Sequence, residues 1–217
     1  MNQLKLVPSH GERAHAKLSP SSAHRWMRCT ASIEACRDIP NTSSIHAEEG
    51  TAAHELAENC LRENVDASFY VGNVFNGFTV DDDMASHVQQ YVDRIHALEG
   101  NLDIEVRLDL RAYAPESFGT ADAVTLNADN KRLYVGDLKY GKGVQVEAEG
   151  NEQGMLYALG ALKEYEIYSE IDEIVIGIYQ PRLNHYPQWT ISRADLLAFG
   201  ETVKTAAEEA LGPNASF

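Results

Sequence analysis

The chain has 217 residues, of which 44% are apolar and 24% charged, and a formal net charge of −15. This composition is that of a folded domain with its own core, and ten Tyr and two Trp argue against disorder. No run of about 18 apolar residues predicts a membrane span, and the start MNQLKLVPSHGERAH lacks the apolar centre of a secretion signal. We therefore expect a cytoplasmic protein with no membrane partner, a flexible segment 1–17 and one domain over 18–217.

The charge is unevenly distributed along the chain. A strongly acidic protein is unfavourable for nucleic-acid binding, because phosphate contacts normally leave a basic footprint. Residues 13–37 nevertheless contain only one acidic side chain, Glu34, against a group of basic ones. These basic side chains are Arg13, Lys17, Arg25, Arg28 and Arg37. We expect a local basic patch on an acidic body.

The first half of the chain predicts helices. LSPSSAHRWMRC offers Ser19 or Ser21 as a helix cap, with Pro20 suited to the first turn. AEEGTAAHELAENCLREN predicts a helix over about 47–63, with its small and apolar residues near one stripe. A second helix is predicted over about 82–98.

The second half predicts a sheet. LDIEVRLDL alternates apolar and charged residues, which indicates a strand over about 102–110. GTADAVTLN and KRLYVGDLK predict two more strands joined by the turn NADN, followed by a helix over 149–168. DEIVIGIYQP predicts a buried strand, YPQWTIS is its candidate partner, and Ser192 caps a last helix over about 193–211. This order predicts an α/β fold with a central mixed sheet and an antiparallel meander.

The turn between the two middle strands sets a register. With its centre between Asp129 and Asn130, the predicted partners have numbers that sum to a constant. They are Leu126 with Leu133, Val124 with Val135 and Asp122 with Asp137. Side chains alternate along a strand, so these six share one face, and Lys139 joins them two residues beyond Asp137.

Two facing carboxylates repel each other, which leaves two explanations for this strand end. A Mg²⁺ or Mn²⁺ ion between Asp122 and Asp137 would remove the repulsion, and Lys139 would orient a water or neutralise developing charge. The alternative is a solvated strand end with an Asp–Lys pair. A third interpretation of GDLKYGKG is a phosphate-binding P-loop using Gly136, Gly141 and Lys142. However, Gly143 stands where Ser or Thr should be, and VQVEAEG does not open a helix.

The same residues resemble the PD-(D/E)XK nuclease superfamily. Its signature is an Asp on one strand and (D/E)-x-K on the next, which here are Asp122 in GTAD and 137–139 in GDLK. The RecB-like branch, whose phage members are distant relatives of lambda exonuclease and the CRISPR adaptation nucleases, adds an upstream GT-x-x-H and a downstream Q-x-x-x-Y. Here these are GTAAHELAE with His54 and QGMLY with Gln153 and Tyr157. The resemblance spans roughly residues 47–160, and the N-terminal LSPSSAHRWMRC looks like the opening of phage and prophage members of this branch.

The resemblance implies a restriction-endonuclease-like core and a metal-dependent active site. It implies that His54, Asp122 and Asp137 hold Mg²⁺ or Mn²⁺, that Lys139 positions the attacking water, and that Gln153 and Tyr157 contact substrate or support the site. Arg25, Trp26 and Arg28 are candidate DNA contacts, with Tyr157 beside them; the alternative packs Trp26 into the core.

Other acidic residues could be metal ligands or part of the solvated surface. Glu105, on the preceding strand, is either an extra acidic ligand or part of a solvated face. Glu48, Glu49 and Glu58 are interpreted as helix surface. Each of the three Cys residues is expected to be a small buried hydrophobe, and they form no CxxC pair.

Many relatives of this branch hold an iron–sulfur cluster with one N-terminal and three C-terminal Cys. Cys29 stands where the first would be, but the chain ends at GPNASF without the later group. Cys29, Cys36 and Cys60 cannot form a four-thiolate site, so we expect no iron–sulfur cluster in this chain.

These inferences lead to a predicted metal-dependent DNA nuclease, an exonuclease in phage-type recombination or replication. Its expected partners are DNA, a phage annealing or single-strand-binding protein, and further copies of itself. Two other functions stay open. One is a catalytically inactive subunit with the nuclease fold that binds DNA or assembles with other proteins, and the other is a small nucleotide-binding protein using GDLKYGKG.

Overall fold

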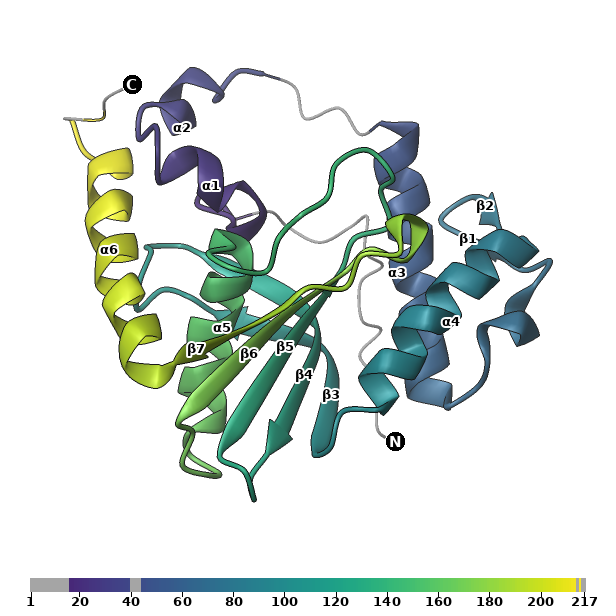
Figure 1. Cartoon of the computed structure of the whole chain (residues 1–217). Coiled ribbons are helices and arrows are strands. Elements are labelled where there is room, and N and C mark those ends of the chain that lie inside the picture. Colours follow the sequence, from purple (N-terminus) through teal and green to yellow (C-terminus); the bar gives the residue numbers. More distant parts are fainter. Residues whose placement is uncertain (1–15, 40–43, 214, 216–217) are drawn as a thin grey trace, which may run out of the picture.

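A five-stranded mixed sheet forms the centre of the structure, a computed structural model that describes residues 16–39, 44–213 and 215 (Figure 1). Its strands lie in the order β3 (Asn101–Asp109), β4 (Phe118–Asn127), β5 (Arg132–Leu138), β6 (Glu173–Tyr179) and β7 (Gln188–Ser192). The β5–β6 pair is parallel, and the other neighbours are antiparallel. This confirms the predicted α/β fold with a mixed sheet and a meander, and β7 is the partner of β6.

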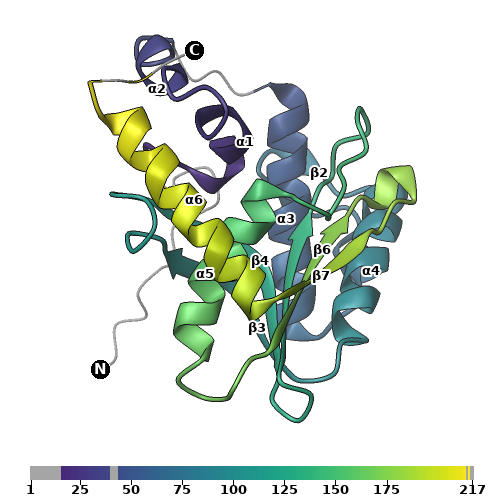
Figure 2. The same cartoon turned by 60° about the vertical axis from the view of Figure 1, so that its left-hand side comes forward.

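Helices cover both faces of the sheet (Figures 1 and 2). On one face, α3 (Ile45–Glu63) and α4 (Asp82–His96) pack in a core with Ala123 and Leu138. On the other, α5 (Glu152–Tyr165) and α6 (Arg193–Leu211) pack on Val124 and Val135. The short helices η2 (Pro20–Ser22), α1 (Ala23–Trp26) and α2 (Ser32–Ala35) lie on this second side, against α5 and α6.

The β4–β5 register follows from the alternation of apolar residues. Leu126 pairs with Leu133 and Val124 with Val135, as predicted. All four belong to the core on the α5 side, because side chains at every second position point to one face. The paired ladder ends at Ala123 and Gly136, so Asp122 and Asp137 occupy the next positions, where the strands open.

The ends of the helices are fixed by local capping bonds. Side-chain oxygens of Ser44, Asp81, Asn151 and Ser192 accept hydrogen bonds from backbone amides in the first turns of α3, α4, α5 and α6. The predicted Ser192 cap is confirmed. Ser19 precedes η2 without capping it, since its hydroxyl contacts that of Ser22 at 2.8 Å instead.

Four small elements escape the sequence patterns. They are the turns η3 (Ala67–Tyr70) and η4 (Pro181–Leu183) and the hairpin of β1 (Val74–Phe75) and β2 (Phe78–Thr79). Segments this short show no periodicity. Within the described residues, no helix has the length and apolar character needed to cross a membrane.

Candidate active site

Five of the predicted site residues meet at the open end of the β4–β5 pair. Asp137 is the last residue but one of β5, and Lys139 follows the strand. Asp122 lies on β4, Gln153 in the first turn of α5, and His54 in the middle of α3. Both layers of helices therefore contribute to one cluster at the end of the interior strands β4 and β5.

Asp137 is held by two neighbours. Lys139 Nζ lies 2.9 Å from Asp137 Oδ2 and 3.2 Å from Oδ1. Gln153 Nε2 donates to Asp137 Oδ1 at 2.9 Å, while Gln153 Oε1 accepts from Lys139 Nζ at 2.9 Å. The amide of Gln153 is thereby fixed in one orientation, and it ties the carboxylate to the ammonium.

Asp122 is paired with the helix on the opposite face. Its Oδ2 accepts from the Leu138 amide at 2.6 Å and lies 3.3 Å from His54 Nε2. His54 Nδ1 lies 2.8 Å from the Gly50 carbonyl oxygen, which can only accept, so Nδ1 is the donor. Nε2 is thus directed at Asp122, the arrangement that second-sphere carbonyls impose on metal-binding histidines.

Tyr157 supports the cluster from α5. Its ring is 7% exposed, and its hydroxyl accepts from Gln153 Nε2 at 3.2 Å. A Cβ at Gly119 would lie 2.5 Å from the ring and 2.9 Å from Pro20, so only glycine at this position of GTAD admits the tyrosine. Of the two roles expected for Tyr157, the structure supports the one of holding Gln153; direct stacking on DNA does not fit its burial.

The electrostatics of the cluster are those of two carboxylates balanced by two cations. Burial raises the pKa of Asp137, and the Asp122 charge adds to this against the opposing effect of Lys139. Burial also raises the pKa of Asp122, but His54 and the Leu138 amide outweigh it, and the net pKa is lowered. Burial lowers the pKa of His54, yet Asp122 overrides it and raises that pKa to about 9.

The donor atoms of the cluster suit a divalent cation, but their present arrangement is not a complete metal site. Asp137 Oδ2 is buried and has no hydrogen-bond donor among the described residues, although the Lys139 ammonium lies 2.9 Å from it. Across residues 16–39, 44–213 and 215, no three His, Cys, Asp or Glu side chains are gathered closely enough to form a metal site. The cationic side chains of Lys139 and His54 lie beside the two carboxylates, where a metal ion would bind. A metal ion could bind only if both cations were displaced or neutralised.

The comparison with protein families adds a family but no activity. The family model described as "Protein of unknown function (DUF2800)" matches residues 15–217. The chain belongs to the DUF2800 family. Every candidate site residue, from Arg25 to Tyr157, lies within the matched part. The nuclease resemblance rests on the motifs and their geometry, and it stays a prediction for this DUF2800 protein.

The N-terminal DNA contacts need one correction. Trp26 is fully buried, and its Nε1 donates to the Ser19 carbonyl at 3.1 Å, so the predicted stacking of Trp26 on bases is wrong. The alternative, packing in the core, is what occurs. Arg25 is exposed, and the exposed Arg28 pairs with Glu152 at 2.9 Å, next to Gln153. Both arginines stay predictions; Arg13 and the rest of 1–15 lie outside the described residues.

Several acidic residues differ from the surface positions assigned to them. Glu48 is exposed as predicted, but Glu49 is half-buried and pairs with Arg182 at 2.8 Å. Glu58 is also half-buried. It pairs with Arg62 at 2.8 Å, and that arginine also donates to the Ile104 carbonyl at 3.1 Å. The helix pattern could not show this, because it carries no information on which strand the helix meets.

A small hollow of about 10 Å³ lies beside His54 and Asp122. Glu58, Glu105 and Tyr91 line it. Glu105 has a φ of 55°, which is unusual for a non-glycine residue inside a strand. It is half-buried, so a purely solvated face does not describe it. Tyr91, whose hydroxyl is buried without a hydrogen bond in the described part of the chain, is a neighbour that sequence reasoning missed.

The structure also bears on the cysteine residues and on the P-loop interpretation of GDLKYGKG. Cys60 is fully buried as expected, whereas Cys29 and Cys36 are half-buried. After Gly143 the chain continues as a loop, and α5 begins only at Glu152. No helix N-terminus follows the glycines directly, so the arrangement lacks the helix that a P-loop requires.

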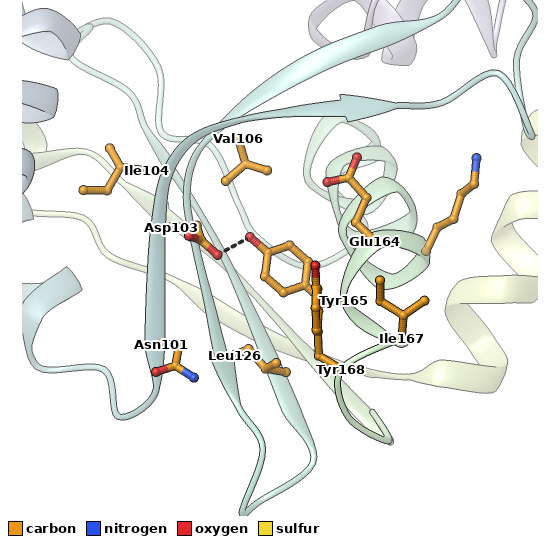
Figure 3. Close-up of a pocket in the computed structure, with 10 residues that line it drawn as sticks. Asn101, Asp103, Ile104, Val106, Leu126, Glu164, Tyr165, Ile167 and Tyr168 are labelled. Atoms are coloured by element: carbon orange, nitrogen blue, oxygen red, sulfur yellow. Dashed lines mark hydrogen bonds between the residues drawn. The ribbon is translucent and has the colours of Figure 1, made fainter. Parts of the chain in front are cut away.

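A larger hollow of about 720 Å³ lies away from this cluster, between the edge strand β3 and the C-terminal end of α5 (Figure 3). None of the five clustered residues lines it. Tyr165 points from α5 across the hollow and donates to Asp103 Oδ2 at 2.7 Å (Figure 3). This bond joins the helix to the edge strand, and we assign it a structural role.

Replacing Tyr165 with Phe should lower the free energy of unfolding by about 1 kcal/mol, because one hydrogen bond is lost and the exposed Asp103 can turn to water. Urea unfolding followed by circular dichroism measures this. Tyr168→Phe is the matched control, since Tyr168 borders the same hollow and is 74% exposed. An equal loss in both variants would contradict the role given to the Tyr165–Asp103 bond.

The raised pKa of His54 predicts a pH-dependent stability of the metal-free protein. The folded pKa, about 9, lies above the ordinary value of 6.5, so the contribution is complete below pH 6.5 and is lost as pH rises through 9. We expect the difference in unfolding free energy between wild type and His54→Gln, in EDTA, to shrink over that interval. A difference independent of pH between 6 and 9.5 would contradict the His54–Asp122 ion pair.

Proposed function

We propose that this DUF2800 protein is a metal-dependent DNA nuclease, an exonuclease that hydrolyses phosphodiester bonds at DNA ends. The observation that carries the proposal is the buried Asp137, tied to Lys139 and Gln153 beside the Asp122–His54 pair. Even with Lys139 beside it, Asp137 has a raised pKa next to a second carboxylate, and this arrangement costs stability and is typical of functional sites. The order of the residues in the chain matches the nuclease motif independently of this geometry.

The residues have distinct roles in the proposed reaction. His54 Nε2 and the carboxylates of Asp122 and Asp137 would hold Mg²⁺ or Mn²⁺, which when bound supplies Lewis-acid activation of water and phosphate. Lys139 would orient the attacking water and neutralise charge that builds up on the phosphate oxygens. Water adds to phosphorus, the bond from phosphorus to the leaving sugar oxygen breaks, and that oxygen takes up a proton. Gln153, fixed by Tyr157, keeps Lys139 near Asp137.

The test is degradation of end-labelled linear DNA and of closed-circular DNA, with Mg²⁺, Mn²⁺ or EDTA. We expect loss of the linear substrate alone, abolished by EDTA and by Asp137→Asn. Asp129→Asn, in the exposed β4–β5 turn, is the matched control and should cut like wild type. Cutting of the circle would show an endonuclease instead. No cleavage of either substrate by the folded, metal-loaded protein would overturn the catalytic proposal.

A catalytically inactive DNA-binding or assembly subunit is the second candidate. The net charge of −15 favours the assembly form of this alternative, because an acidic protein is unfavourable for contact with DNA phosphates. So does the pairing of many described basic side chains with carboxylates, such as Arg132 with Glu173 and Arg193 with Glu166. DNA binding that persists in EDTA, without cleavage under either metal, would identify this alternative.

A further inference from the structure

The loop of residues 139–151 joins the two halves of the candidate site. It begins at Lys139 after β5 and ends at Asn151, the residue that caps α5 two positions before Gln153. The loop projects beyond the end of the sheet beside the η4 turn (Figure 2). The loop is therefore tied at both ends to residues of the candidate site, Lys139 at its start and Gln153 two positions after its end.

Two side chains from the η4 region hold the far part of the loop in place. Gln180 is 2% exposed; its Oε1 accepts from the Val146 amide at 2.7 Å, and its Nε2 donates to the Val144 carbonyl at 2.9 Å. His185 Nε2 lies 3.2 Å from the Val146 carbonyl and 3.3 Å from Glu147 Oε1. A buried amide that uses both its ends on one segment fixes the backbone there.

The tip of this held loop, residues 141–144, presents an unusual surface. Val144 is 79% exposed, the highest value for a large apolar residue in the described chain. Lys142 is exposed and forms no ion pair with a described carboxylate, unlike Arg28, Lys131 or Lys204. Apart from the adjoining residues of the chain, no described atom lies within 4 Å of a Cβ built on Gly141 or Gly143, so the space beside both glycines that flank Lys142 is open.

We propose that residues 141–144 are a DNA contact of the active site, in which Lys142 pairs with a backbone phosphate and Val144 packs against a sugar or an unstacked base. This inference rests on the proposed nuclease function and adds the element that grips the substrate. On an acidic protein the few unpaired cations must supply the phosphate contacts. The glycines allow the backbone to approach the DNA closely, and the hold by Gln180 reduces the entropy lost on binding.

The experiment measures binding of a fluorescent duplex by anisotropy across a series of NaCl concentrations, in the Asp137→Asn background with Mg²⁺ present. Lys142→Ala should weaken binding about threefold to tenfold and lower the slope of log K against log salt by about one. Lys142→Arg should restore the slope. Val144→Ser should weaken binding by a smaller factor with the slope unchanged, since no charge is removed.

Lys204→Ala is the matched control, because Lys204 is a partly exposed lysine on α6 that pairs with Glu201 at 2.7 Å. It should leave both affinity and slope unchanged. If the Asp137→Asn protein binds DNA and the added Lys142→Ala change alters neither affinity nor salt slope, Lys142 has no role in binding. The nuclease proposal would still stand. Absence of both DNA binding and cleavage in the wild type would overturn the two proposals together.

Discussion

Replacing Asp137 with Asn is expected to abolish metal-dependent cleavage, by about a thousandfold or more, and at the same time to stabilise the metal-free protein. Asp137 is buried beside Asp122, and burial together with that charge outweighs Lys139 and raises its pKa, so the ionised form costs stability in the metal-free protein. An amide of the same shape removes the charge but keeps an oxygen that accepts from Gln153 and Lys139. Because the raised pKa makes the ionised carboxylate unfavourable in the folded state, we expect a gain of about 1 kcal/mol in the free energy of unfolding in EDTA.

Cleavage assays and urea unfolding in EDTA and in Mg²⁺ measure the two effects together. Wild type should be stabilised by Mg²⁺, because a ligand that binds only the folded state shifts the unfolding equilibrium, whereas Asp137→Asn should not. Asp129→Asn, exposed in the turn, controls for removal of a negative charge as such. A variant that loses stability in EDTA would show that Asp137 serves as the structural partner of Lys139, which is the solvated-pair explanation of the strand end.

The sequence was sufficient for the sheet and for the residues at its open end. Alternation fixes which residues of β4 and β5 share a face, and Leu126–Leu133 and Val124–Val135 then follow from a short turn. Because side chains on both strands follow this period of two, the turn position alone predicts that Asp122 and Asp137 are neighbours. The motif order added His54 and Gln153, which local patterns alone could not connect to the strands.

What the sequence could not provide is the identity of partners across elements. Trp26 has both an apolar ring and a polar N–H, so the same residue suits a core or a nucleic-acid contact, and only its burial decides. Glu58 lies half-buried because α3 crosses β3 at this point, where Arg62 reaches Ile104. The left-handed φ of Glu105 could not be predicted either, because the position holds neither glycine nor asparagine, the residues that usually adopt this conformation.

Replacing Lys139 with Met should separate metal binding by the cluster from DNA cleavage. In the metal-free protein Lys139 Nζ lies 2.9 Å from Asp137 Oδ2, where it neutralises the carboxylate that would bind the metal. Removing this cation should strengthen Mn²⁺ binding by about fivefold, the equivalent of about 1 kcal/mol for one unit charge near 4 Å in water-like surroundings. Cleavage should nevertheless fall by about a hundredfold to a thousandfold, because Lys139 is the group proposed to orient water and to stabilise phosphate charge.

Isothermal titration with Mn²⁺ and single-turnover cleavage report on these two properties. Lys131→Met, just before β5 and paired with Glu170, is the control and should change neither. Asp137→Asn is expected to lose both Mn²⁺ binding and cleavage. Lys139→Met is expected to bind Mn²⁺ more tightly but to cleave DNA more slowly. Weaker metal binding in Lys139→Met would mean that the lysine builds the site rather than competing for it. Unchanged cleavage would remove Lys139 from the reaction, and with it the argument that links the DLK segment to nuclease chemistry.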